Sequence, residues 1–212
     1  MSFVRFIVIA CVCAAFLLPA CSPLGGSLRP VAFYTLEYST PAPQDTGSDT
    51  IVKFDRFYSA RSYDSTAMLY KPDAYKIVAY NYHRWRTTPS DMVTDCLLRD
   101  FLHSGLFRAV FSYRQPETAR FLVGGGVEEF VEAREANGWN AVLSLHVTLL
   151  DLNQDEGTEK VVFQKRYRVA QPIDGESPEF FAEGMSAAMA RISMEIIDDV
   201  SRATKGQAGQ RP

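Results

Sequence analysis

The tetrapeptide at residues 18–21, Leu-Pro-Ala-Cys, could support one kind of chemistry, the attachment of a lipid to a cysteine sulfur. It ends an apolar run over residues 6–18, which one basic residue, Arg5, precedes. A bilayer core needs about 20 apolar residues, so this run is too short to span it and is typical of a secretion signal. The sequence therefore predicts a lipobox, with residues 1–20 removed as a signal peptide and a diacylglyceryl group on Cys21. The alternative is an ordinary cleaved signal with an incidental cysteine.

Ser22 follows the predicted lipid attachment site. In the lipoproteins that this N-terminus resembles, an aspartate there would favour retention in the inner membrane, so serine predicts anchoring to the outer membrane. Each buried methylene of an acyl chain contributes about 0.8 kcal/mol, and several chains on Cys21 would hold the protein almost permanently. Residues 21–30 lack a periodic pattern and should form a tether that reaches at most roughly 36 Å when fully extended. We therefore expect a domain close to the periplasmic face of its membrane.

The remaining polar residues give little support for catalysis. His83, His103 and His146 have no second histidine or cysteine at a metal-binding spacing, and no serine has the glycine context of a nucleophile elbow. Apart from the covalent lipid on Cys21, we expect no cofactor and no metal. The sequence therefore predicts that the protein is not an enzyme.

Three nearby carboxylates leave one catalytic alternative open. Glu128, Glu129 and Glu132 lie in one predicted strand, where Glu128 and Glu132 would share a face with Phe130 between them. A paired acid and base is one interpretation, but a solvated strand face explains these residues without further assumptions. The preceding glycines 124–126 do not match a nucleotide loop, and in a strand they favour a bulge or a close backbone approach.

Composition and charge favour one acidic extracytoplasmic domain. The chain has 212 residues, 47% of them hydrophobic, which is enough for one core, and residues 31–203 are the predicted domain. The net charge is −3, and loss of the leader with Arg5 makes it −4, which argues against a nucleic-acid partner. Cys96 would then be the one thiol besides Cys21, and its place on an apolar helix face predicts packing rather than reactivity.

A helix at residues 89–104 should organise the fold. Thr88 can cap its first N–H groups, Pro89 fits the first helical turn, and Gly105 suits the left-handed residue at its end. Apolar residues inside it recur at helical spacing. Predicted strands flank it at residues 75–82 and 106–111, so we expect a crossover between two neighbouring strands.

The other elements complete a single-domain α/β fold with a mixed sheet. Strands are predicted at residues 31–38, 51–58, 119–133, 141–149 and 161–169, the last two forming an antiparallel hairpin, and residues 67–70 pair with 75–82 around Pro72 and Asp73. A C-terminal helix should begin after Ser177 and pack a methionine-containing stripe on the sheet. Residues 204–212 are predicted to be a disordered tail.

The central stretch resembles the family of ABC-type transport auxiliary lipoproteins, the lipoprotein partners of MCE-domain lipid transport systems. The residues that carry the resemblance are Tyr34, Thr35, Leu36, Met68, Leu69, Tyr70, Tyr80, Tyr82, Arg84, Trp85, Pro89, Met92, Leu97, Leu102, Gly105, Phe107 and Val110. Arg86 and Thr88 depart from the family pattern, which has a small residue after the tryptophan and two adjacent prolines before the helix. The resemblance implies an anticodon-binding-domain-like arrangement, an MCE-domain protein as partner and a homo-oligomeric ring.

Arg84 and Trp85, together with Pro89, are the family motif, and two interpretations of them remain. They could form part of a docking surface for the transport partner. Alternatively, Trp85 fills the gap between strand and helix while Arg84 stacks on it or binds backbone carbonyls at the turn, which is the interpretation we favour.

The functional prediction is an outer-membrane lipoprotein of the periplasm that serves as the auxiliary subunit of an MCE-type lipid transport system. A lipoprotein that carries a lipid in its own pocket and one that helps to assemble outer-membrane proteins are the two alternatives. An envelope hydrolase is the weakest.

Overall fold

The computed structural model describes residues 29–43, 47–136, 138–152 and 160–208. The leader, Cys21 and Ser22 lie outside these residues, as does most of the predicted tether. The compact unit described below begins at Val31. No helix of the described ranges is both long and apolar enough to cross a membrane.

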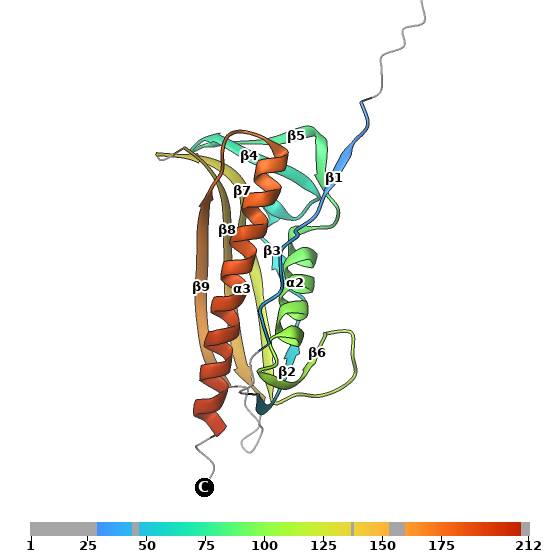
Figure 1. The fold of residues 1–212 in the computed structure, drawn as a ribbon, viewed down its shortest axis with the longest axis vertical. Helices are drawn as coiled ribbons and strands as arrows, with labels where there is room; N and C mark the ends of the chain where they lie inside the picture. Colours follow the sequence, from blue (N-terminus) through green and yellow to red (C-terminus); the bar gives the residue numbers. More distant parts are fainter. Residues whose placement is uncertain (1–28, 44–46, 137, 153–159, 209–212) are drawn as a thin grey trace, which may run out of the picture. The chain divides into compact units, whose positions relative to one another are not determined.

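The domain is built from a nine-stranded mixed sheet and two long helices (Figure 1). The strands are β1 (Ala32–Tyr34), β2 (Ser48–Phe54), β3 (Tyr58–Ser59), β4 (Ala67–Asp73), β5 (Lys76–Trp85), β6 (Phe107–Phe111), β7 (Phe121–Glu135), β8 (Gly138–Asp151) and β9 (Lys160–Pro172). The helices are η1 (Arg61–Tyr63), α2 (Pro89–His103) and α3 (Pro178–Ala208). The predicted single-domain α/β fold with a mixed sheet and a C-terminal helix is thus confirmed.

Strand β7 is the centre of the sheet. One of its edges pairs with β8 along almost the whole strand, and β8 pairs in turn with β9, both antiparallel. The other edge pairs in succession with β2, β3 and β4, all parallel to β7. The chain from β2 to β4 therefore behaves as one interrupted strand, from which residues around η1 loop out.

Further strands extend the sheet from the two ends of this interrupted strand. β6 pairs with β2, whereas β5 pairs with β4 and carries β1 on its far edge. Because β5 and β6 attach to different segments, they are not neighbours, so the expected crossover between adjacent strands is wrong. Helix α2 instead runs from the β4–β5 end of the sheet to the β2–β6 end.

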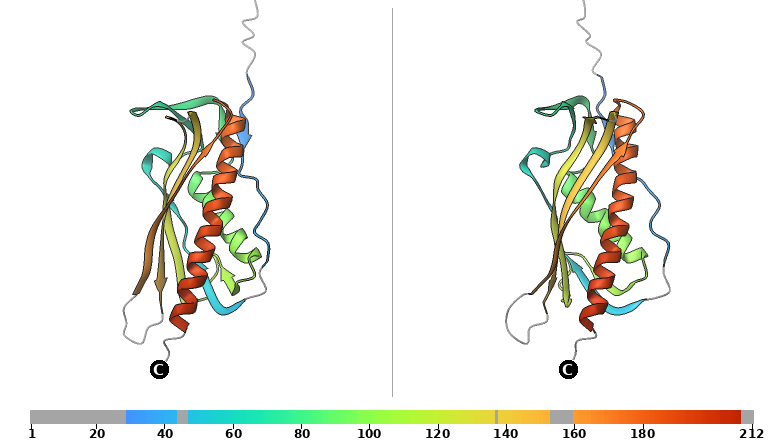
Figure 2. Two further views of the ribbon diagram at one scale, coloured as in Figure 1. Left: turned by 60° about the vertical axis from the view of Figure 1, so that its left-hand side comes forward. Right: turned by 90° about the vertical axis from the view of Figure 1, so that its left-hand side faces the viewer.

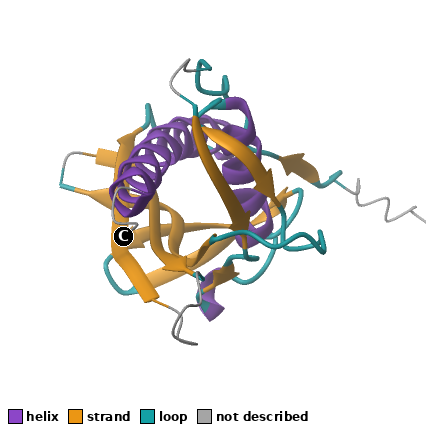
Figure 3. Cartoon of the chain, turned by 90° about the horizontal axis from the view of Figure 1, so that it is seen from below, coloured by secondary structure: helices purple, strands orange, loops and turns teal. Residues whose placement is uncertain are grey.

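Both helices cover the same side of the long strands (Figure 2), and the strands curve around them (Figure 3). The predicted apolar stripe of α3 is fully buried against the sheet; its members are Phe181, Met185, Ala188, Met189, Ile192, Ile196 and Val200. Helix α2 begins as predicted, because the Thr88 side chain accepts a hydrogen bond from the Asp91 N–H and Pro89 lies at the first position. Gly105 adopts a φ of 68°, which glycine tolerates best.

Several predicted boundaries need correction. Strand β1 is shorter than residues 31–38, and β2 ends at Phe54, before the separate strand β3. Strand β5 continues to Trp85. Helix α3 continues to Ala208, with Thr204 buried, so the disordered tail predicted from residue 204 begins too early. Residues 209–212 lie outside the described chain.

The three glycines of β7 permit close packing rather than forming a bulge. Gly124, Gly125 and Gly126 pair regularly with β8, and the register shifts only between Val127 and Glu129. A Cβ on Gly125 would lie 2.2 Å from the carbonyl oxygen of His146 and 2.9 Å from Cε1 of Phe57. The predicted close approach is therefore confirmed, and the bulge lies just beyond the glycines.

We expect Gly125→Ala to lower the free energy of unfolding by about 1–3 kcal/mol, because the added methyl group must displace backbone atoms of β8. Gly124→Ala is the matched control, since its Cβ would lie 3.5 Å from Cβ of Asp55, an ordinary contact. The control should leave stability unchanged or raise it by up to about 1 kcal/mol. Urea unfolding followed by tryptophan fluorescence measures both, and equal effects would contradict this account of the glycines.

Candidate functional site

The family-motif residues lie where β5 ends and α2 begins. Trp85 is fully buried, and its ring packs edge-on against Phe130 of β7 and Phe181 of α3, with centroids 5.1 and 5.3 Å away. Its indole Nε1 has no hydrogen-bond partner among the residues that the structure describes. The tryptophan thus joins the sheet to the start of α3 by packing alone, and its ring does not reach the surface.

Arg84 supports the same junction through the backbone. Its guanidinium donates to the carbonyl oxygens of Tyr80 and His83, the second at 2.9 Å. These carbonyls lie in the part of β5 where its pairing with β4 shifts register, so the arginine side chain supports the backbone there. Pro89 is buried at the first turn of α2. All three motif residues therefore shape the turn between strand and helix.

The first described strand is fixed to the same junction. The Tyr34 hydroxyl of β1 donates to Glu179 of α3 at 2.5 Å and lies 2.9 Å from Nδ1 of His83. Since the hydroxyl has one proton, His83 acts as the donor in the second bond. Burial, followed by the hydrogen bond to Glu179, raises the pKa of Tyr34 to about 12. A chain that enters through β1 is thereby attached to both the sheet and α3.

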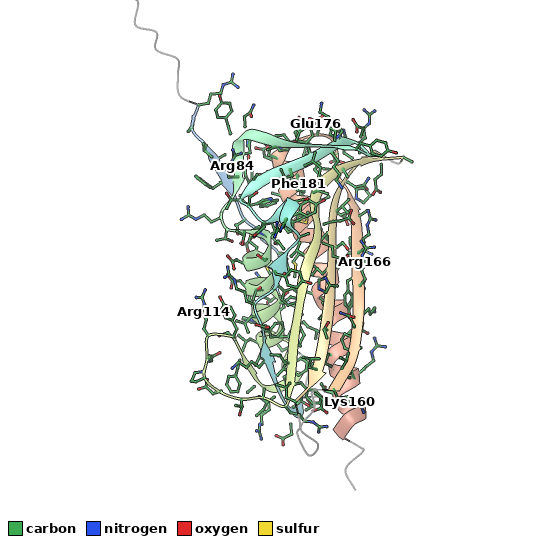
Figure 4. The ribbon with its side chains drawn as sticks, turned by 180° about the vertical axis from the view of Figure 1, so that it is seen from behind. Arg84, Arg114, Lys160, Arg166, Glu176 and Phe181 are labelled. Atoms are coloured by element: carbon green, nitrogen blue, oxygen red, sulfur yellow. The ribbon has the colours of Figure 1, made fainter. Side chains whose placement is uncertain are left out.

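The sheet face opposite the helices, on which Figure 4 labels Arg166, carries a network of ion pairs. Arg166 of β9 contacts both Glu128 and Glu129 of β7, and Arg168 contacts Glu129 at 2.9 Å and Glu135 at 3.1 Å. The predicted stripe of Arg166 and Arg168 is thus bound to carboxylates across β8. Partial burial acts to raise the pKa of Glu128, but the hydrogen bonds from Arg166 and Ser144 outweigh it and lower that pKa.

The bulge in β7 decides how the predicted carboxylate group is divided. It turns Glu128 and Glu129 to the same face, where both contact Arg166. Glu132 lies on the other face and accepts a hydrogen bond from Tyr80 at 2.7 Å. The expectation that Glu128 and Glu132 share a face is therefore wrong. These two carboxylates cannot act together as an acid and base pair, because the sheet separates them.

A histidine and a tyrosine pack over the glycines beside this network. The Tyr58 hydroxyl lies 2.8 Å from Nε2 of His146, whose Nδ1 is 3.6 Å from Glu128. A Cβ on Gly126 would lie within 3 Å of both rings, so the glycine makes room for them. The nearby Ser144 hydroxyl donates to Glu128 rather than to the histidine. This is a different arrangement from a serine–histidine nucleophile pair.

Two buried carboxylates hold the helices in place: Asp100, which the sequence analysis missed, and Glu132, which it placed on a solvated strand face. Asp100 of α2 is fully buried and accepts hydrogen bonds from Tyr38 at 2.7 Å and from Ser193 of α3 at 2.6 Å. Glu132 lies beneath the start of α3, and its burial, reinforced by Glu176, raises its pKa to about 7 against the lowering effect of Tyr80 and the Ser177 N–H. Acidic residues inside otherwise apolar segments were the one sequence signal that could have singled them out.

One cavity, about 450 Å³ in volume, lies at the β2–β6 end, beside the C-terminal part of α3. Most of its lining is polar: Ser48, Asp49, Thr50, Arg108, Thr118, Arg120, Thr204 and Lys205, with Ile51, Ala119 and Phe121. Arg108 is paired with Asp49 at 2.9 Å, and Arg120 with Asp151 at 2.8 Å. A cavity for an acyl chain is instead lined mainly by apolar groups.

The structure also places the candidates for metal binding and thiol chemistry. Within the described residues, no group of three histidine, cysteine or carboxylate side chains could hold a metal ion. Cys96 is buried on α2, and burial raises the pKa of its thiol to about 11, so the reactive thiolate is scarce at neutral pH. Packing rather than reactivity explains this cysteine.

Comparison with known proteins identifies a family and several structural neighbours. A family model described as the ABC-type transport auxiliary lipoprotein component matches residues 34–197. No curated protein matches the sequence. The solved structure of protein XCC0632 from Xanthomonas campestris is similar over 85% of this chain and 100% of its own, with a TM-score of 0.74 and 18% identity. The hypothetical protein CT253 from Chlamydia trachomatis gives a TM-score of 0.52 and 12% identity over 73% of this chain and 96% of its own. At these identities the two neighbours support the fold.

Variants of Trp85 separate its packing role from a docking role. We expect Trp85→Phe to lose about 1–2 kcal/mol of unfolding free energy, because no hydrogen bond to Nε1 is lost, and Trp85→Ala to lose about 3–5 kcal/mol. Partner capture from detergent extracts should survive in the folded Trp85→Phe variant. Loss of capture by a Trp85→Phe variant that remains folded would show instead that the indole contacts the partner.

Glu132 should make stability depend on pH. Its folded pKa of about 7 exceeds that of an unfolded glutamate, so the folded state binds the proton more tightly, and stability falls as pH rises from about 4.5 through 7. We expect a loss of a few kcal/mol between pH 5 and pH 8. Glu132→Gln should remove most of this dependence, whereas the control Glu135→Gln, on the ion-paired outer face, should retain it. Urea unfolding at several pH values measures this, and identical pH profiles for all three proteins would refute the assignment.

Proposed function

Because the chain belongs to the family of ABC-type transport auxiliary lipoprotein components, we propose that it is a non-enzymatic lipoprotein of the outer membrane that docks an MCE-type lipid transport system. One observation carries this proposal: the family match begins at residue 34, just after the lipobox at 18–21 and its tether. The predicted lipid attachment site therefore directly precedes a domain of a transport auxiliary family.

The proposed mechanism is mechanical rather than chemical. Acyl chains on Cys21 hold the protein at the periplasmic face of the outer membrane, and Ser22 permits its transfer there. The network that joins Tyr34 to Glu179 attaches the entering chain to a rigid domain. This domain then receives the end of an MCE-domain partner. A symmetric homo-oligomer could surround the channel of such a partner, since cyclic symmetry closes a ring.

The nature of the buried and paired groups supports a role without catalysis. Asp100 and Glu132 bind side chains of the domain itself, and the charges of the outer face pair with one another. Eight of the eleven residues that line the cavity at the β2–β6 end are polar, which disfavours a lipid carried in that cavity. A receptor that works through its surface agrees best with these features.

The anchor is tested with Cys21→Ala, exported behind a conventional cleavable secretion signal. We expect the mass of the wild-type mature N-terminus to include acyl chains, and only detergent should extract this protein from membranes. Cys21→Ala should lack the added mass, appear in the periplasmic fraction and fail to co-purify with an MCE-domain protein. Cys96→Ala is the matched control, because it removes a buried thiol outside the lipobox.

A Ser22→Asp variant extends the same fractionation and should move the protein to the inner membrane. A wild-type protein that is unacylated, or that a salt wash releases, would refute the anchor. An acylated protein that co-purifies with an outer-membrane barrel protein alone would favour the assembly alternative.

A further inference from the structure

The exposed apolar side chains of the described domain are concentrated at one end. Ten large apolar residues are exposed in the part of the chain that the structure describes, and six belong to the elements around the start of β1; these six, which we term the anchor-end patch, are Val31, Phe33, Tyr75, Ile77, Tyr82 and Phe180. Their exposure ranges from 40% for Phe180 to 100% for Tyr75. Apolar surface gathered in this way commonly marks an interaction site.

Strand pairing places Val31, Phe33 and Tyr82 where the chain enters the domain, while Tyr75 and Ile77 lie further along the β4–β5 hairpin. Phe33 pairs with Arg84 in the parallel β1–β5 ladder, which places Val31 beside Tyr82. Ile77 lies on the same strand β5, and Tyr75 is in the turn between β4 and β5. Phe180 is in the first turn of α3, next to the Glu179 that binds Tyr34 of β1. Figure 1 shows β1, the β4–β5 hairpin and the start of α3 at the same end of the sheet.

From this geometry we propose that the anchor-end patch contacts the lipid surface to which the protein is anchored. The inference rests on the proposed acylation of Cys21. Residues 21–30, which connect the lipid attachment site to Val31, reach at most roughly 36 Å, and as a flexible chain they span about 15–20 Å on average. So short a tether keeps this end of the domain at a high effective concentration near the bilayer.

The composition of the patch suits the headgroup region. Phenylalanine, isoleucine and valine bury apolar surface, while tyrosine places its ring in the apolar layer and keeps its hydroxyl in water. Exposed basic side chains accompany them at Arg29, Lys76 and Arg86, and exposed acidic ones at Asp73 and Asp174. With both signs present, apolar contact rather than net charge must supply the attraction. The lipid itself provides the affinity, so the patch chiefly fixes the orientation of the domain.

The contact would have a functional consequence. With the β1 end on the membrane, the β2–β6 end and the C-terminal part of α3 point into the periplasm (Figure 1). A partner that arrives from the inner membrane would then meet the opposite end of the domain first. The patch would thus fix which end of the domain faces the partner, whereas a flexible tether fixes only the distance of the domain from the membrane.

A cysteine-labelling experiment tests the proposal on the full-length acylated protein. In a Cys96→Ala background, Ile77→Cys and Tyr75→Cys carry an environment-sensitive fluorophore, and vesicles of phosphatidylethanolamine and phosphatidylglycerol contain or lack brominated acyl chains. Val161→Cys is the matched control, an exposed aliphatic residue, 57% against 44% for Ile77, beside Lys160 at the far end of β9 (Figure 4).

We expect brominated lipid to quench the labels at residues 75 and 77 at least twofold more than the label at 161, with a blue-shifted emission. Equal quenching at 77 and 161 in protein that floats with the vesicles would overturn the contact surface and leave the anchor intact. Failure of the wild type to float would overturn the anchor and this inference together. Shielding of residues 75 and 77 only after addition of an MCE-domain protein would assign the patch to that partner and overturn the membrane contact.

Discussion

The pairing of both edges of β7 is the constraint on which the rest of the domain depends. One edge binds β8 over most of its length, while the other binds three separate segments, β2, β3 and β4, in chain order. These segments come so close to the middle of β7 that no side chain fits there. Gly125 and Gly126 leave the necessary space, because a Cβ at either position would overlap atoms of β8 or of residues 57 and 58. The close approach of these segments to β7 therefore depends on Gly125 and Gly126.

The helices follow from this sheet. Because β5 and β6 attach to opposite ends of the interrupted strand, α2 must run along the sheet between them, and Trp85 fills the corner where it begins. Helix α3 then lies beside α2, and Asp100 joins them through Ser193. A buried carboxylate with two hydroxyl donors is costly to separate, so this contact fixes the relative position of the helices more specifically than apolar packing could.

Local patterns in the sequence predicted the helices and most strands, because caps, glycines and periodicity act within a few residues. The stripe of α3, the cap at Thr88 and the β8–β9 hairpin are of this kind. Pairings between distant segments left no such trace. Nothing near Val52, Tyr58 or Tyr70 indicates that all three align with β7, and the one-residue bulge that separates Glu128 from Glu132 depends on β8. The role of Trp85 could be proposed from its position, but its partners Phe130 and Phe181 could not.

The same network that stabilises the junction also determines how an anchor could act on the domain. A lipid at the end of a tether restricts where a protein is, yet it does not restrict how the protein is turned. Here the first strand after the tether is paired with β5 and is bonded through Tyr34 to Glu179 and His83. A contact that fixes the orientation of β1 therefore also fixes the orientation of the sheet and of α3, because no flexible loop lies between them. Under the proposed function, apolar groups at this end of the domain would orient the anchored protein toward its transport partner.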